Sequence, residues 1–348
     1  MGMLAVREKR PTVRELAKET GVSIATVSRF LNQDYRAMSA ATRQRIQEAV
    51  ERSGYVYTKN REQGMVGVVL PNLTDPFFAQ ILSALAPVLD QAGLSMQLCL
   101  TQDSLDQERR CIRRLLGPEI SGILYMSTVS SEENCFDLLK EAGKPFVVLD
   151  SYLSEYNAPA LAFSNGVYGM YAVTQYLLQA GHEKIAYLSG LRAGMFEHYR
   201  YQGYVNGLLD SGHQVNPNLV RFTGFGIQDG MESFQDLLDS GEQFTAVICE
   251  SDQMAAGVYK VCYQNRIAIP DQLSVVGYNN SLVAQLVEPP LTSVDQRVDL
   301  LTAEAVEMLQ KQIRGEQLSE RVKKITPQLV FRASVKELAQ RDPGKELL

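Results

Sequence analysis

The sequence predicts an all-α helix-turn-helix headpiece followed by an α/β body of two doubly wound parallel-sheet lobes. Three observations lead to this fold class. Helical spacing around a glycine marks the N-terminal part, short apolar strands alternate with helices from Met65 onward, and the two parts differ in charge. Residues 1–63 hold 12 lysines and arginines against 7 acids, whereas the rest holds 22 against 33. This asymmetry is typical of a basic nucleic-acid-binding part on an acidic body.

Residues 12–31 read TVRELAKETGVSIATVSRFL and predict two short helices. Thr12 begins an S/T-x-x-E capping box, so the first helix is expected to start at Val13. Gly21 supplies the turn, and Ser23 is a suitable N-cap for the second helix. Two such helices form the pattern whose second helix enters the DNA major groove.

The second helix has an outer face suited to reading bases. It is expected to bury Val27, Phe30 and Leu31 and to expose Ile24, Ala25, Thr26, Ser28 and Arg29. Hydroxyl and guanidinium groups can bond phosphates or base edges, and small apolar side chains suit thymine methyls. An ordinary three-helix bundle with a polar face is the alternative from this pattern alone.

A third helix is predicted from its N-cap Ser39 to Gly54, a typical C-terminal glycine. Its apolar positions, expected to pack on the first two helices, are Ile46, Ala49 and Val50. Arg43 and Arg45 lie on the opposite side, either as phosphate contacts or as part of a solvated face. Residues 58–64 are polar and without periodicity, which is typical of a linker.

From Met65 onward the chain alternates between apolar runs and helical stretches. The runs are MVGVVL, LSMQLCL, ISGILYM, PFVVLD, KIAYLSG, TAVICE and LSVVGY. The helical stretches span residues 77–92, 106–116, 131–142, 166–180, 198–211, 229–239 and 252–265. Continuous apolar strands separated by helices are typical of parallel sheets covered on both faces. The length exceeds one doubly wound unit, so we expect two lobes.

Several segments resemble the LacI/GalR family of bacterial transcription regulators. GVSIATVSRFLN, MSAATRQRI and the following GY are similar to its DNA-binding headpiece. VGVVLPNLTDPFFAQ, GHEKIAYLSG, RYQGY, VVGYNN and PPLTSVDQ are similar to its effector domain, itself like the type I periplasmic sugar-binding proteins. The resemblance covers residues 11–334. It implies a dimeric, sequence-specific DNA-binding repressor with a small molecule, a sugar or sugar derivative, bound between two lobes joined by three crossovers.

The resemblance also implies domain boundaries and DNA contacts. The headpiece is expected at 1–56, a shortened linker at 57–64, the N-lobe at 65–163 plus 293–326, the C-lobe at 164–292 plus 327–335, and a tail at 336–348. The expected DNA-contacting residues are Thr12, Ser23, Ile24, Ala25, Thr26, Ser28, Arg29, Asn32, Arg43 and Tyr55.

The linker departs from the family pattern. Tyr57 and Thr58 stand where the family has a proline-asparagine start, and no linker leucine is present to wedge into the minor groove. We therefore expect operator binding with little or no central kink. A small-molecule binding module with a weak or vestigial headpiece is the alternative function.

Nine polar or aromatic residues are candidates for the ligand site, because ligands of α/β sheets lie beyond the carboxyl ends of strands. They are Asp75, Phe77, Phe78, Ser127, Arg200, Phe225, Ser251, Asn279 and Gln296. Phe77 and Phe78 have a plain core role as the alternative, and Asp75 has the capping of a helix that begins at Pro76.

The ligand's charge is suggested by two departures from the family. Asn279 stands where relatives commonly carry Asp, and Ser251 where they carry Asn. The missing negative charge favours a neutral or anionic effector, such as a sugar phosphate, over a cationic one. Asp150, which follows the PFVVL run, is a further carboxylate in this region.

Other functions find little support in the sequence. No G-x-S-x-G, P-loop, H-E-x-x-H or dinucleotide-binding fingerprint is present, so we expect no enzyme. The 5 cysteines and 3 histidines are scattered, which predicts no metal or cofactor and indicates reduced thiols in the cytoplasm. No apolar run reaches the ~18 residues of a membrane helix. The helix faces around Ile81 and Leu85 are candidates for the dimer interface, with a core role as the alternative.

Overall fold

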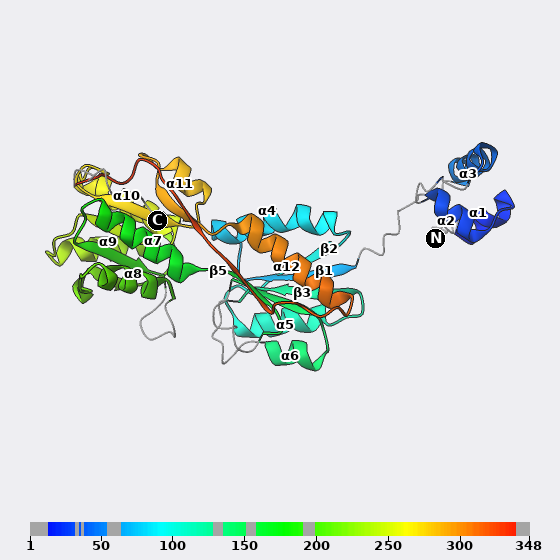
Figure 1. Cartoon of the computed structure of the whole chain (residues 1–348), viewed down its shortest axis with the longest axis horizontal. Helices are drawn as coiled ribbons and strands as arrows, with labels where there is room; N and C mark the ends of the chain where they lie inside the picture. The colour runs from blue at the N-terminus through cyan, green and yellow to red at the C-terminus, as the bar shows by residue number, and fades with distance from the viewer. Residues whose placement is uncertain are drawn as a thin grey trace, which may run out of the picture. The chain divides into compact units, whose positions relative to one another are not determined.

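The computed structural model describes residues 13–31, 35, 38–53, 64–127, 135–150, 158–190 and 199–338 (Figure 1). They belong to two compact units, one within residues 1–63 and the other within 64–348. The predicted linker therefore falls largely outside the described residues.

The first unit consists of helices α1 (Val13–Thr20), α2 (Ile24–Leu31) and α3 (Ala40–Ser53). As predicted, the Ser23 hydroxyl caps α2 by accepting a hydrogen bond from the Thr26 amide at 3.1 Å. The Ser39 hydroxyl caps α3 in the same way. Gly21 turns the chain between α1 and α2 with a φ of +65°. Residues with a β-carbon are disfavoured in this left-handed conformation, which explains why a glycine occupies the turn.

A small apolar core holds the three helices together. Its buried members are Leu16, Ala17, Val27, Ile46 and Ala49, with Val22, Phe30, Met38 and Val50 packed against them. The periodicity of the sequence thus predicted this core correctly. The side chains of Val13 and Leu31, together with Thr12 and Gly54, lie outside the described part of the chain.

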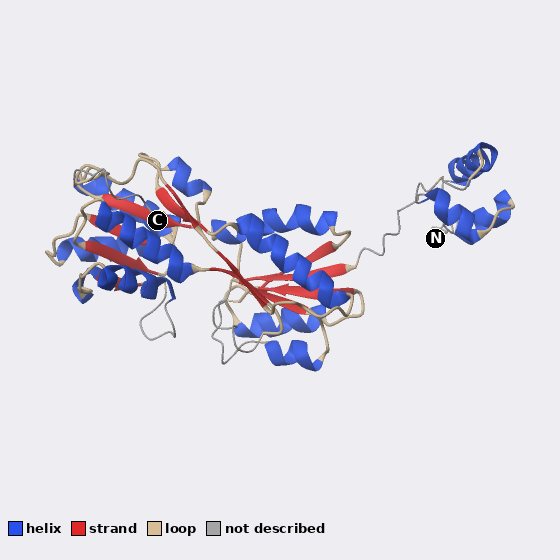
Figure 2. Ribbon diagram, in the orientation of Figure 1, coloured by secondary structure: helices blue, strands red, loops and turns tan. Residues whose placement is uncertain are grey.

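The second unit contains two six-stranded sheets (Figure 2). Its strands are β1 (Met65–Leu70), β2 (Ser95–Leu100), β3 (Ile120–Tyr125), β4 (Phe146–Leu149), β5 (Leu161–Ser164), β6 (Ile185–Ser189), β7 (Val220–Phe222), β8 (Ala246–Cys249), β9 (Ser274–Tyr278), β10 (Thr292–Asp295), β11 (Val322–Ile325) and β12 (Gln328–Val330). Its helices are α4 (Pro76–Gln91), α5 (Leu105–Leu115), α6 (Phe136–Glu141), α7 (Gly166–Gln179), α8 (Tyr199–Asp210), α9 (Ile227–Asp239), α10 (Asp252–Asn265), α11 (Leu282–Leu286) and α12 (Val298–Ile313).

The two sheets define an N-lobe and a C-lobe. The N-lobe sheet has the strand order β11-β5-β4-β3-β1-β2, and the C-lobe sheet has the order β12-β10-β9-β8-β6-β7. The strands pair in parallel, except that β12 runs antiparallel to β10. This arrangement confirms the predicted fold class of a helical headpiece followed by two doubly wound lobes.

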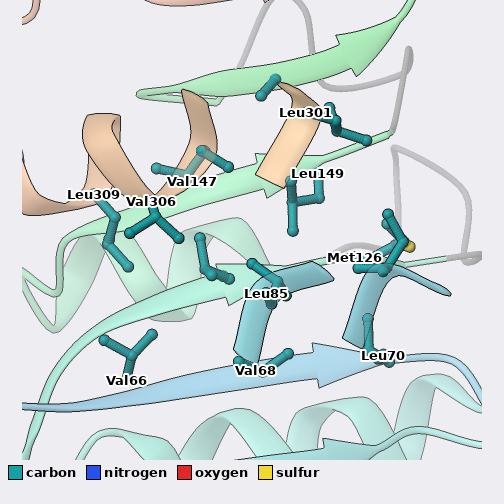
Figure 3. Close-up of a cluster of buried hydrophobic side chains, with 14 of the residues drawn as sticks. Val66, Val68, Leu70, Leu85, Met126, Val147, Leu149, Leu301, Val306 and Leu309 are labelled. Carbon is teal, nitrogen blue, oxygen red and sulfur yellow. The ribbon is translucent and has the colours of Figure 1, made fainter. Parts of the chain in front are cut away.

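Helices cover both faces of each sheet. In the N-lobe, α4 and α12 bury one face, where Leu85, Leu301 and Val306 meet Val68 and Val147 (Figure 3). The helices α5 and α6 bury the other face. In the C-lobe, α9 and α10 cover one face, and α7 and α8 cover the other. Each lobe therefore has two apolar layers around its sheet.

The candidate dimer interface on α4 is wrong. Ile81 and Leu85 are fully buried in the N-lobe core, so the alternative role applies to both. The apolar stripe of α4 faces its own sheet, which leaves these side chains unable to contact another molecule.

The chain crosses between the lobes three times. The first crossing follows β5, and the third lies between β11 and β12. The second was expected before Ser293, but β10 pairs with β9 in the C-lobe, with Val294 opposite Tyr278. This crossing therefore follows Asp295. The TSVD segment is not an apolar run, and it forms a strand because it pairs with β9 and β12.

The C-terminal segment is longer than predicted. Residues 336–338, expected to begin the tail, are bound to the C-lobe: the Lys336 amide donates to the Ser274 hydroxyl, and the Leu338 amide donates to the Ala180 carbonyl. No helix in the described ranges has the length and apolar character that crossing a membrane requires.

Candidate functional site

The outer face of α2 matches the predicted base-reading surface. Ile24 is 50% exposed, and Ala25, Ser28 and Arg29 are exposed as well. Thr26 is half-buried, and its hydroxyl lies 2.8 Å from that of Ser23. The face thus offers a guanidinium, hydroxyls and small apolar groups along one helix, the chemistry used to read base edges.

A second basic group lies beside this helix. The guanidinium of Arg43 stacks over the ring of Tyr35 at 3.9 Å from its centroid, and that ring contacts Phe30 at 6.0 Å between centroids. Stacking limits the freedom of an exposed arginine and holds its donors outward. The other expected contacts, Thr12, Asn32 and Tyr55, lie outside the described residues.

Arg200 is central to the second candidate site. It lies at the start of α8, where its guanidinium donates to the Glu250 carbonyl at 3.1 Å and stacks 4.1 Å from the ring centroid of Tyr278. Burial raises the pKa values of the N-lobe residues Asp75 and Asp150, and the positive charge of Arg200 opposes both shifts. Carboxylates of one lobe and a guanidinium of the other therefore share one electrostatic environment.

Asp150 supplies the clearest sign that this region receives a ligand. It adopts a left-handed φ of +46° at the end of β4, and its Oδ1 atom makes no hydrogen bond with the described residues. A buried carboxylate oxygen without a donor is costly, and a hydroxyl of a bound molecule can satisfy it. The sequence identified this carboxylate only by its place after a strand.

Asn279 and Gln296 lie together at the boundary of the lobes. The Gln296 amide donates to Asn279 Oδ1 at 2.7 Å, and both side chains are buried. Asn279 has a φ of +100°, a conformation that an asparagine tolerates better than most residues. Because Gln296 follows the second crossing, this bond connects a candidate ligand residue to a segment that joins the lobes.

Two aromatic candidates belong to the core. Phe77 and Phe78 are buried with the apolar side chains of the N-lobe, so their core alternative applies. Phe225 is half-buried and packs so closely on Gly190 that a β-carbon there would lie 2.1 Å from its ring. An aromatic residue after a strand can thus serve the helix–sheet interface instead of a ligand.

Three polar candidates are engaged within the protein. Asp75 caps α4 by accepting from the Phe77 amide at 2.9 Å. The Ser251 hydroxyl caps α10 and donates to the Phe225 carbonyl at 2.7 Å. The Ser127 hydroxyl donates to Glu108 at 2.5 Å. Small polar residues at strand ends often cap the helix that follows, which explains the roles of Asp75 and Ser251.

A groove lies beside this site between the two lobes. Its volume is about 810 Å³, and its lining includes Pro76, Gln80, Ser83, Asn279, Asn280 and Leu282. The Gln80 amide donates to the Asn280 carbonyl across the lobes at 3.3 Å. Asn280 also accepts from Arg332 at 2.6 Å, on the segment that follows the third crossing. The groove is therefore bounded by contacts that depend on how the lobes are arranged.

Sequence reasoning missed two residues of the Arg200 site. Glu250 directly follows β8, Tyr278 ends β9, and both are buried. A glutamate directly after the apolar AVIC run is a signal that could have identified Glu250. No group of three or more metal-ligating side chains comes together in the part of the chain that the structure describes.

Comparisons with known proteins match both parts of the chain. Residues 12–57 match the family described as bacterial regulatory proteins, lacI family, and residues 174–335 match the periplasmic binding protein-like domain. The chain is 28% identical over 334 residues to the HTH-type transcriptional repressor PurR of Photobacterium profundum, covering 94% of this chain and 99% of that protein.

Solved structures show the same fold. The transcriptional regulator CelR in complex with cellobiose has a TM-score of 0.72 and 29% identity, covering 93% of this chain and all of that one. A lac repressor dimer bound to operator and the anti-inducer ONPF has a TM-score of 0.79 at 23% identity, covering 94% of this chain and all of that one.

Proposed function

This chain belongs to the lacI family of bacterial regulatory proteins, and we propose that it represses transcription by binding operator DNA under the control of a small hydroxylated molecule. The observation that carries the ligand half of the proposal is the buried, unsatisfied oxygen of Asp150 near Arg200. The exposed face of α2 carries the DNA half.

The proposed ligand is a sugar or sugar derivative. A hydroxyl group both donates and accepts, so one sugar can donate to Asp150 and accept from Arg200. The relative CelR was solved with cellobiose, which supports a carbohydrate in this cleft.

The proposed mechanism depends on the three crossings between the lobes. A ligand that bonds Asp150 of the N-lobe and Arg200 of the C-lobe favours one angle between them. The contacts of Asn279 with Gln296 and of Asn280 with Arg332 lie beside two crossings, so they change with that angle. The ligand thereby shifts the population of molecules whose headpieces fit the operator.

We also propose that the repressor is a homodimer, because one helix-turn-helix reads too few bases for specificity. Large apolar side chains are exposed on one side of the C-lobe. Tyr263 is 88% exposed on α10, and Leu282 and Leu286 are 62% and 73% exposed on the adjoining α11. This apolar surface replaces α4 as the candidate interface, with a second copy of the chain as its partner.

The test is selection of bound sites from a random DNA pool, with and without a panel of sugars that includes cellobiose. We expect one enriched, two-fold symmetric site, released by a sugar of the panel. The variant Arg200→Ala should keep the site and lose the release, because a charged donor to a buried partner contributes about tenfold to hundredfold in affinity.

Arg221→Ala is the matched control, since Arg221 pairs with Asp236 on the surface of the same lobe. It should leave the release intact. A protein that enriches no site is a ligand-binding module with a weak headpiece, and unchanged release by Arg200→Ala removes Arg200 from the ligand site.

A further inference from the structure

Glu250 is a buried acid without a role in the site as described so far. It directly follows β8 and is only 1% exposed. The Tyr187 hydroxyl donates to its Oε1 at 2.5 Å, and the Gly190 amide donates to its Oε2 at 3.0 Å. Because both oxygens accept hydrogen bonds, the side chain has the acceptor pattern of an ionised carboxylate.

Glu250 is connected to Arg200 in two ways. Its backbone carbonyl accepts from the Arg200 guanidinium. Its partner Tyr187 stacks on Tyr204, at 4.7 Å between ring centroids, and Tyr204 lies one turn after Arg200 on α8. Residues of β6 and α8 thus contact one another and also contact Glu250 and Arg200.

The charges of the two residues act on the same surroundings. Burial raises the pKa of Tyr278 to about 12, with Glu250 acting in the same direction and Arg200 in the opposite one. Tyr187 shows the same pattern: burial and Glu250 raise its pKa, and Arg200 lowers it. The negative charge of Glu250 therefore acts on the same part of the cleft as the positive charge of Arg200, the proposed ligand contact.

We propose that Glu250 is a specificity-determining residue whose buried charge offsets Arg200, so that the cleft accepts uncharged hydroxylated molecules and excludes their phosphorylated counterparts. This inference rests on the proposed function and deepens it. A phosphate near Arg200 must share the guanidinium with Glu250, Asp75 and Asp150, and like charges repel strongly in a site with little water. Hydroxyl groups carry no such cost, since they donate to acids and accept from the guanidinium. Asn279 and Ser251 favour a neutral or anionic effector over a cationic one, and the charge of Glu250 narrows this expectation to a neutral sugar.

The N-lobe provides a matched control. Glu108 on α5 is also fully buried, and its carboxylate accepts from the Tyr125 and Ser127 hydroxyls. It has the same acid–tyrosine arrangement as Glu250, but Tyr125 and Ser127 belong to the N-lobe, whereas Arg200 belongs to α8 of the C-lobe. Removing its charge tests the general effect of losing a buried acid.

The experiment titrates the protein with inorganic phosphate by calorimetry. We expect Glu250→Gln to bind phosphate at least tenfold more tightly than the parent protein, and Glu108→Gln to bind it as the parent does. The double variant Glu250→Gln with Arg200→Ala should lose the gain, because the gain depends on an Arg200 guanidinium whose charge is no longer offset. A merely structural role for Glu250 predicts weaker or equal binding.

Equal phosphate affinity of Glu250→Gln and the parent protein overturns the inference. So does a gain that survives the removal of Arg200. If Glu250→Gln does not fold, the paired variant Tyr187→Phe with Glu250→Met removes the charge together with its donor and carries the same expectation.

The result separates this inference from the proposed function. If Glu250→Gln gains phosphate affinity but no sugar releases the operator, the proposed function is contradicted and the inference about the charge of Glu250 is supported. If a neutral sugar releases the operator but Glu250→Gln gains no phosphate affinity, the proposed function is supported and the inference about Glu250 is contradicted.

Discussion

Arg29 is the residue of α2 best placed to read a base, because it is exposed and its planar guanidinium can donate two parallel hydrogen bonds. We expect Arg29→Ala to cost roughly 1–3 kcal/mol at the selected operator and to relax preference at one base position. Arg43→Ala should weaken all sequences alike, because a stacked arginine beside the helix suits a phosphate. Binding of the two variants to a set of single-base operator mutants measures the difference. Identical specificity profiles for Arg29→Ala and the parent protein contradict this placement of the recognition helix.

Single residues show where sequence reasoning stops. Arg200 and Asp75 were chosen by type and by position after strands, and the structure brings their charges into one environment. Phe77 has the right type as well but is buried in the core, since apolar burial uses aromatic residues wherever a helix meets a sheet. Glu250 was missed because its meaning depends on Tyr187 and Gly190, which are far from it in sequence.

The helices α7 and α8 approach each other through a glycine. A β-carbon at Gly203 would lie 2.2 Å from the Val167 carbonyl oxygen, so no side chain can be added unless the backbones separate. We expect Gly203→Ala to destabilise the protein by roughly 1–3 kcal/mol, despite the gain of about 1 kcal/mol in helix propensity. Urea denaturation measures this effect.

The matched control is Leu209→Ala, because Leu209 is exposed on the same helix. It should change stability by no more than about 0.5 kcal/mol. Because Arg200 lies one turn before Gly203, the glycine variant should also lose ligand affinity. A Gly203→Ala protein as stable as the parent shows that the helices tolerate separation.

Elements with apolar sequences were predictable, and elements defined by pairing were not. Each of the seven apolar runs overlaps a strand, because a strand buried on both faces needs a continuous apolar sequence. Five strands match none of these runs. Two of them are β5 and β7, although the LAFS sequence of β5 is buried and largely apolar. The other three are β10, β11 and β12. They read TSVD, VKKI and QLV, and they exist because a neighbouring strand pairs with them. Lysines in β11 suit the edge of its sheet, where polar side chains reach the solvent.

The proposed dimer depends on the apolar surface of α10 and α11. We expect Leu286→Lys to convert the dimer to a monomer at micromolar concentration, because a charge buried in an apolar interface is costly. Operator affinity should fall with it, since two headpieces then no longer bind as one unit. Analytical ultracentrifugation and a gel-shift titration provide the two measurements.

Leu209→Lys is the control for charge alone, because Leu209 is exposed on α8, which covers the other face of the C-lobe sheet. It should leave the dimer intact. A Leu286→Lys protein that sediments as a dimer places the interface elsewhere.

The crossings of the chain also determine the order in which a newly made molecule becomes competent. The N-lobe core needs Leu301, Val306 and Leu309 from α12, and its sheet needs β11. The C-lobe sheet needs β12 a few residues later, so neither sheet can be complete before β11 and β12 have been synthesised. The headpiece has its own core and precedes both lobes in the sequence. We therefore expect a message that ends early to yield a fragment that keeps the helix α2 without the cleft, and such a fragment should compete for operators without responding to the ligand.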